Sequence, residues 1–174
     1  MPNHDNTPLA VLGTGIMGAA MARRWALHEF SVTVWNRDRT KAEALTDTGV
    51  TVADSPADAV RGAQVVVTML ADGDATEQVV TDALSAIDPD AIWLQMGTVG
   101  IEATDRLAAM AADAGIAFVD APVSGTKQPA EQGKLTVLAS GPEELKDRLL
   151  TVFGAVAART VWVGDVGAGS RLKL

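Results

Sequence analysis

Three glycines near the start of the chain have the spacing of a loop that binds phosphate groups. Gly13, Gly15 and Gly18 form a GxGxxG pattern between the apolar run 9–12 and the alanine-rich segment 16–28. In such a unit the first glycine permits a tight turn, the second lets the backbone approach a pyrophosphate, and the third lets helix and strand pack closely. Free N–H groups and the positive end of the helix dipole then face the phosphates. The pattern predicts a dinucleotide-binding turn, although glycines also serve turns without a ligand; its residues are Gly13, Thr14, Gly15, Ile16, Met17 and Gly18.

The residues that follow the next apolar run indicate which dinucleotide fits. NAD-binding domains place an Asp or Glu about 20 residues beyond the glycines, where it accepts hydrogen bonds from the ribose hydroxyls. Here the run 31–35 ends in Asn36 and Arg37, so a neutral amide stands in place of the acid. The guanidinium fork of Arg37 suits a 2′-phosphate, and Thr40 and Lys41 add a hydroxyl and a second positive charge. We therefore predict NADP as the cofactor, held here by Asn36, Arg37 and Thr40.

Two alternatives for this segment stay open. Asp38 would accept hydrogen bonds from the ribose of NAD, which is the less favoured cofactor. In the other alternative Arg37 and Arg39 are merely solvated, and Asp38 caps the next helix.

The elements that must position these residues alternate along the chain. Several of the strand candidates are continuous apolar runs, which are typical of parallel strands covered on both faces; the candidates occupy residues 9–12, 31–35, 49–52, 64–70, 91–96, 116–119, 135–139 and 160–163. Ser55-Pro56 and Gly141-Pro142 each predict the start of a helix, and Asp74 with Glu77 resembles a capping box. Alternating strands and helices predict an α/β fold: a doubly wound, Rossmann-type, mostly parallel sheet with helices on both faces.

Composition excludes several classes of partner. The 174 residues include 14 Lys plus Arg and 22 Asp plus Glu, giving a formal charge of −8. A nucleic acid or an anionic membrane would need a concentrated basic surface, so neither is expected as a partner. With no Cys and two His, the sequence predicts neither a disulfide nor a metal site. Residues 1–7 do not resemble a secretory signal and no apolar run approaches the ~20 residues of a membrane span, so we expect a cytoplasmic protein.

Further motifs give the chain a resemblance to a known family. After the glycine turn and Asn36-Arg37, the chain carries four more segments in a characteristic order: Thr68-Met69-Leu70, Gln95–Val99, Phe118–Gly125 with the later Gly133-Lys134-Leu135, and the glycine-spaced stretch from Gly164 to Lys173. In these the sequence resembles the β-hydroxyacid dehydrogenases, which include 3-hydroxyisobutyrate dehydrogenases, and it is more distantly similar to 6-phosphogluconate dehydrogenase and imine reductases. The resemblance runs from Leu9 to Lys173.

The resemblance implies an activity and a role for each segment. The activity is hydride transfer between a nicotinamide and a small 3-hydroxy acid or β-semialdehyde acid. Met69 and Leu70 would border the cofactor, and Thr98 would lie near the nicotinamide. Ser124 and the N–H of Gly125 would bind the substrate carboxylate, and Lys173 would be the catalytic acid/base. Asp120 is interpreted as structural.

The resemblance also implies how the chain is divided. We expect a flexible terminus at residues 1–7, a dinucleotide-binding domain at 8–164, and the start of an interdomain helix at 165–174. The family's second, helical domain is absent, so we expect cofactor binding without turnover by this chain and a homo-oligomer when full length. Gly97 and Ile101 depart from the family pattern. The segment 126–130 departs from it as well, and this departure leaves the substrate open. The alternatives are a non-catalytic NADP-binding module and a reductase of imines, against which Lys173 argues.

Overall fold

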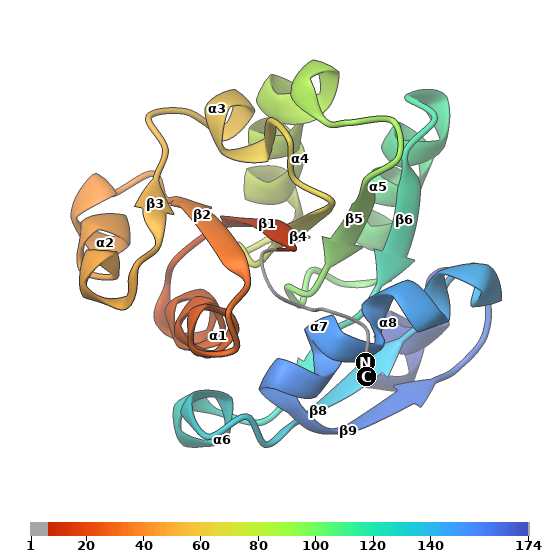
Figure 1. The fold of residues 1–174 in the computed structure, drawn as a ribbon. Coiled ribbons are helices and arrows are strands. Elements are labelled where there is room, and N and C mark those ends of the chain that lie inside the picture. Colours follow the sequence, from red (N-terminus) through yellow and green to blue (C-terminus); the bar gives the residue numbers. More distant parts are fainter. Residues whose placement is uncertain (1–6, 174) are drawn as a thin grey trace.

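The computed structural model describes residues 7–173, and its strands and helices alternate along most of the chain (Figure 1). The strands are β1 Pro8–Leu12, β2 Ser31–Trp35, β3 Thr51–Val52, β4 Val65–Thr68, β5 Ile92–Gln95, β6 Ala117–Asp120, β7 Val123–Ser124, β8 Leu135–Ala139 and β9 Ala157–Trp162. The α-helices are α1 Ile16–Leu27, α2 Arg39–Glu43, α3 Pro56–Val60, α4 Gly73–Ala83, α5 Ile101–Asp113, α6 Lys127–Glu131, α7 Lys146–Val156 and α8 Ala168–Lys173. None of the helices within residues 7–173 has both the length and the apolar character needed to cross a bilayer.

Six strands form one parallel sheet in the order β3-β2-β1-β4-β5-β6. This is the strand order of dinucleotide-binding folds, and the order reverses between β1 and β4. Helices cover both faces of the sheet (Figure 1). The predicted α/β class, a doubly wound Rossmann-type sheet, is therefore confirmed.

The apolar runs of β1, β4 and β5 form strands because both of their faces are buried. In β1, Leu9 and Val11 pack into the core on the side of α1 and α7, whereas Ala10 and Leu12 pack into the core on the side of α3, α4 and α5. A strand whose successive side chains enter two different cores reads as continuous apolar sequence. Carboxyl ends of all six strands consequently meet along one edge of the sheet, where the loops that carry the candidate residues begin.

The last strands do not extend this sheet. β7, β8 and β9 form a separate three-stranded sheet in which β7 and β8 are antiparallel and β8 and β9 are parallel. Only two residues separate β6 from β7, which is too few for the crossover that a parallel neighbour requires. The chain therefore leaves the large sheet at this point, and a bridge between Asp120 and Ser140 joins the two sheets.

Two of the predicted helix starts differ in detail. The Ser55 hydroxyl accepts a hydrogen bond from the Asp58 N–H, and Pro56 opens α3 as predicted. The capping box at Asp74 is wrong, because α4 begins at Gly73 and the Asp72 carboxylate accepts from the Ala75 N–H at 2.8 Å. After Gly141-Pro142 a 3-10 turn, Glu143–Leu145, precedes α7, so that α-helix starts later than predicted.

Candidate cofactor and substrate site

The turn between β1 and α1 is shaped by two of its three glycines. Gly13 has φ +110°, and a Cβ there would overlap the Met69 carbonyl group at the end of β4. A Cβ on Gly18 would overlap the carbonyl of Gly13. These glycines let the turn lie against β4 and let α1 start close beneath it, so their role is in the fold itself.

Gly15 differs from them because the space in front of it is open. No atom lies within 4 Å of the position that a Cβ on Gly15 would occupy, and its φ of −67° suits any residue. It is the N-cap of α1, and no side chain caps that helix end. The buried Thr14 hydroxyl beside it also lacks a hydrogen-bond partner among the described residues. Free donors around an open glycine fit the pyrophosphate of a dinucleotide.

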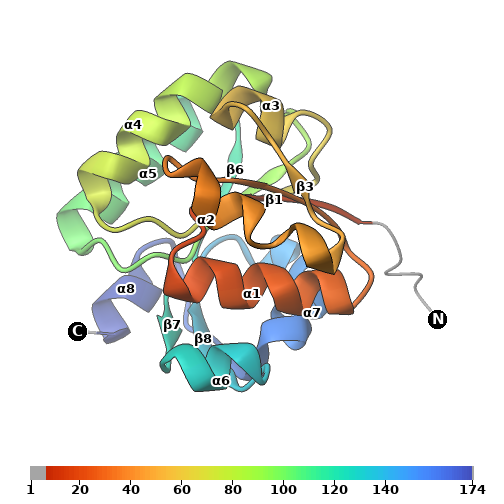
Figure 2. The same cartoon turned by 90° about the vertical axis from the view of Figure 1, so that its left-hand side faces the viewer.

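A cavity of about 430 Å³ extends from this turn along the outer side of α1. Figure 2 shows α1 facing the viewer between α2 and α6. Residues of α2 and α6 line the two sides of the cavity. Three basic side chains line it, one from each helix: Arg23, Lys41 and Lys127. The charge of Lys127 therefore lies by the phosphate turn, and its partner Glu131 is 3.8 Å away.

Asn36 connects the end of β2 to the phosphate turn. Its side-chain oxygen accepts a hydrogen bond from the Thr14 N–H at 2.8 Å, and its amide nitrogen donates to the Asp38 carbonyl at 3.0 Å. Asp38 caps α2 by accepting from both the N–H and the hydroxyl of Thr40. These hydrogen bonds hold the pKa of the Asp38 carboxyl below its usual value. The capping alternative for Asp38 is thus what the structure contains, and it also engages the Thr40 hydroxyl.

The two arginines after β2 have different partners. Arg39 lies 2.7 Å from the Glu43 carboxylate and 2.6 Å from that of Asp54. Arg37 instead donates to the neutral side chain of Gln78 on α4, at 3.2 Å. The positive charge of Arg37 is consequently the one that remains available for an anionic ligand.

The residues that follow β4 and β5 lie at the same edge of the large sheet as the phosphate turn. Met69 and Leu70 follow β4 and border the phosphate turn, since they would contact a Cβ on Gly13. A Cβ on Gly97 would lie 3.1 Å from the Leu70 carbonyl oxygen, so the two strand ends pack closely. Thr98 follows as an exposed residue, and it does not cap α5, whose N-cap is Gly100.

Lys173 and Ser124 are brought together although 49 positions separate them in the sequence. The Lys173 amine donates to the carbonyl of Val123, the neighbour of Ser124 in β7, at 2.5 Å. Ser124 and Gly125 are exposed, and Gly125 has φ +134° where a Cβ would contact Leu135. The Ser124 hydroxyl and the Gly125 N–H therefore lie on an exposed segment, and the partly buried amine of Lys173 reaches it from α8.

Asp120 is a buried carboxylate beside this segment. Burial raises the pKa of the Asp120 carboxyl, and hydrogen bonds from Ser170 and Ser140 oppose the rise, as does the charge of Arg171. An acid whose pKa is raised by folding stabilises the folded state most below its unfolded pKa, near 3.8, and loses that contribution as the pH rises through the folded pKa.

We expect the stability of the domain relative to an Asp120→Asn variant to fall as the pH rises from about 4 to neutrality. The variant has no titratable group at position 120. The difference between its free energy of unfolding and that of the unmodified domain therefore gives the contribution of Asp120 protonation. Urea unfolding at a series of pH values measures that difference. A difference that stays constant with pH, or grows, would contradict the assignment.

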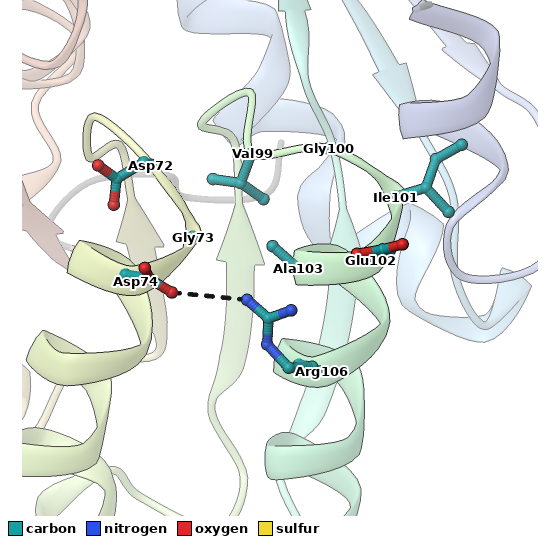
Figure 3. A pocket seen from close by; sticks show the side chains of 9 residues that line it. All are labelled: Asp72, Gly73, Asp74, Val99, Gly100, Ile101, Glu102, Ala103 and Arg106. Carbon is teal, nitrogen blue, oxygen red and sulfur yellow. Dashed lines mark ion pairs between the residues drawn. The ribbon is translucent and has the colours of Figure 1, made fainter.

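A second cavity, of about 510 Å³, lies between the first turns of α4 and α5 (Figure 3). Asp74 and Arg106 face each other across it at 3.7 Å, and Asp72 and Glu102 add further carboxylates. Its excess of negative charge repels phosphates, so it does not suit the dinucleotide.

Some functional features were missed from the sequence. The partners of Asp120 on α8, the different pairing of Arg37 and Arg39, and the place of Lys127 beside the turn depend on contacts between distant segments. The glycines at positions 164, 167 and 169 are the available signal in the sequence, and their spacing indicates only the resemblance to the segment before the family's lysine.

The open phosphate turn at the point of strand reversal defines a class of protein, the dinucleotide-binding α/β domains. Comparison with known proteins supports the same class. Residues 8–164 match the family model described as the NAD binding domain of 6-phosphogluconate dehydrogenase, and the chain belongs to that family.

Several individual relatives are named reductases or dehydrogenases, and others are named cytokine-like nuclear factor N-PAC. The chain is 36% identical over 166 residues to glyoxylate/succinic semialdehyde reductase 1 of Arabidopsis thaliana, covering 94% of this chain and 57% of the relative. The solved structure of a Mycobacterium tuberculosis 3-hydroxyisobutyrate dehydrogenase with L-serine has a TM-score of 0.94 at 31% identity, covering 97% of this chain and 58% of that one. An imine reductase of Myxococcus stipitatus with NADP+ has a TM-score of 0.89 at 27% identity, covering 95% and 58%. The chain spans just over half the length of these proteins and is an NAD(P)-binding domain.

Proposed function

We propose that this chain is the NADP(H)-binding domain of an oxidoreductase that interconverts a small 3-hydroxy acid and its β-semialdehyde acid. The observation that carries the proposal is the meeting of the Lys173 amine with the Ser124 segment in a domain that has an open phosphate turn. The turn from Gly13 to Gly18 would hold the pyrophosphate. The bound nicotinamide would supply or accept the hydride.

The residues of the substrate end have separate tasks in this proposal. The Ser124 hydroxyl and the Gly125 N–H donate to the substrate carboxylate, while Thr98, Met69 and Leu70 border the nicotinamide half of the site. Lys173 gives a proton to the developing alkoxide in reduction and takes it back in oxidation. Its amine, now bonded to a backbone carbonyl, is already partly withdrawn from water. The role of Lys173 as proton donor to an alkoxide favours a carbonyl substrate over an imine, for which the lysine has no assigned role.

NADP is proposed over NAD because of the residues after β2. The Arg37 guanidinium has a neutral partner, and Asp38, the acid that would select NAD, is already engaged as a helix cap. Asn36 would act by fixing the turn through Thr14, and Thr40 would act by fixing Asp38, to which its N–H and its hydroxyl both donate.

Arg37→Ala is expected to remove most of the preference for NADPH, because a hydrogen bond between charged groups contributes ~1.5–3 kcal/mol, or roughly ten- to a hundredfold in affinity. NADH affinity should change little. Calorimetric titration of both cofactors measures the two dissociation constants. Arg39→Ala is the matched control, since that guanidinium already has two carboxylate partners, and it should keep the preference. Equal affinities of the unmodified chain for NADPH and NADH would overturn the choice of cofactor.

The proposal extends to the organisation of the chain. Residues 8–164 form the dinucleotide-binding domain, and residues 165–174 begin a helix that connects to a substrate-binding domain. The match of the family model over residues 8–164 and the start of α8 at Ala168 support this division. Residues 1–6 of the expected flexible terminus lie outside the described residues. The cytoplasmic location, the homo-oligomer and inactivity of the isolated chain stay predictions.

A further inference from the structure

The point where the two sheets meet is also where α8 is attached. Asp120, the last residue of β6, is fully buried. Its N–H donates to the Ser140 carbonyl at 3.0 Å, and the Ser140 N–H donates to the Asp120 carbonyl at 2.7 Å. The backbone of this single residue thus fixes β8 relative to the large sheet.

The side chain of Asp120 holds the first turn of α8 from the same position. The Ser170 N–H donates to one carboxylate oxygen at 2.8 Å, and the Ser170 hydroxyl donates to the other at 2.7 Å. The Ser140 hydroxyl accepts from the Gly169 N–H at 3.0 Å and lies 3.4 Å from the carboxylate. Hydrogen bonds to a charged group are the stronger kind, and burial keeps water from competing for them.

Gly169 shows how closely the helix is held. A Cβ on Gly169 would overlap the Leu138 carbonyl of β8 and lie 3.3 Å from the Asp120 carbonyl oxygen. The backbone of α8 therefore lies directly against the junction of β6 and β8, and the helix cannot slide there without breaking its hydrogen bonds to Asp120.

Other contacts of α8 are weaker. Arg171 lies 3.8 Å from the Asp105 carboxylate, and both side chains are about half exposed, so this ion pair contributes little. The Thr104 and Ser170 hydroxyls are 3.3 Å apart, a long separation for two hydroxyl groups. Apart from the bond between the Lys173 amine and the Val123 carbonyl, the hydrogen bonds from Ser170 to Asp120 are the shortest side-chain bonds of α8 among the described residues.

Lys173 follows Ser170 by three residues, which is about 4.5 Å along a helix axis. Because Ser170 and Lys173 lie within about one turn of the same helix, a displacement of Ser170 moves Lys173 by nearly the same distance. We propose that Asp120 and Ser170 are positioning residues that hold the Lys173 amine beside Ser124. The inference rests on the proposed function, in which that amine is the acid/base.

Competitive acylation of lysines in the 174-residue chain tests the positioning directly and requires no turnover. Mass spectrometry gives the reaction rate of Lys173 relative to the exposed Lys41 in the same sample. Lys173 should react more slowly than Lys41 in the unmodified chain. Asp120→Asn and Ser170→Ala should raise its relative rate roughly ten- to a hundredfold, the change expected for losing a hydrogen bond to a charged group.

Thr104→Val is the matched control, because it removes a buried hydroxyl beside Ser170 and leaves the bonds to Asp120. It should leave the Lys173 rate unchanged. Amide exchange in β1 and β4 verifies that each variant is folded, and Ser170→Ala serves if Asp120→Asn does not fold. An unchanged Lys173 rate in folded Ser170→Ala would overturn the inference.

Kinetics of the full-length gene product separates this inference from the proposed function. If both hold, Ser170→Ala lowers kcat for the semialdehyde acid while the dissociation constant for NADPH stays the same. Absence of turnover in the unmodified full-length protein refutes the proposed function, while the acylation result still decides whether Asp120 and Ser170 position Lys173.

Discussion

Gly15→Val is expected to abolish NADPH binding while the domain stays folded. The space before Gly15 is open and its φ is accessible to valine, so the substitution should cost about 1 kcal/mol of stability at most, as for other changes at a helix N-cap. The branched side chain would, however, fill the space that the pyrophosphate needs and separate it from the N–H groups of α1. Loss of even one charge-assisted hydrogen bond weakens binding roughly tenfold or more, and here several are lost together, so we expect more than ~100-fold.

Calorimetric titration with NADPH and circular dichroism measure the two parts of this prediction. Gly18→Ala is the contrasting variant, because its Cβ would overlap the Gly13 carbonyl, and it should lower the unfolding temperature markedly. Normal NADPH binding by folded Gly15→Val would show that the three glycines serve the turn alone.

Lys173→Ala in the full-length gene product is expected to lower turnover by ~10²–10⁴-fold, the usual contribution of general acid–base catalysis. The lysine lies on α8 and its amine donates to the Val123 carbonyl rather than to the phosphate turn, so the dissociation constant for NADPH should stay the same. Steady-state kinetics with short semialdehyde acids and cofactor titration give the two quantities.

Lys173→Arg distinguishes proton transfer from simple positive charge. Arginine keeps the charge but does not release its proton at any pH where the protein is folded, so this variant should be as inactive as the alanine variant. Lys134→Ala removes an exposed lysine at the start of β8 and should keep full activity. Near-normal turnover by Lys173→Ala would remove the lysine from the proposed mechanism.

The sequence by itself determined the features that depend on neighbouring residues. The candidates 31–35 and 135–139 match β2 and β8 to the residue, because each has buried apolar positions at every second residue, which is the period of a strand. The glycine pattern likewise located the turn after β1, and Ser55-Pro56 located the start of α3. Local backbone geometry and burial determine the strands, the turn and the start of the helix. Each can therefore be predicted from the residues of its own segment.

Tertiary structure decided what each of those residues does. Gly13 and Gly18 contact other backbone while Gly15 faces open space, although the pattern treats all three alike. Which arginine keeps a free charge depends on Gln78 and Asp54, which approach from other elements. The sequence identified Asp120 as structural but not its partner Ser170, 50 positions away. Such contacts form when packed elements bring distant residues together, and spacing along the chain does not encode that approach.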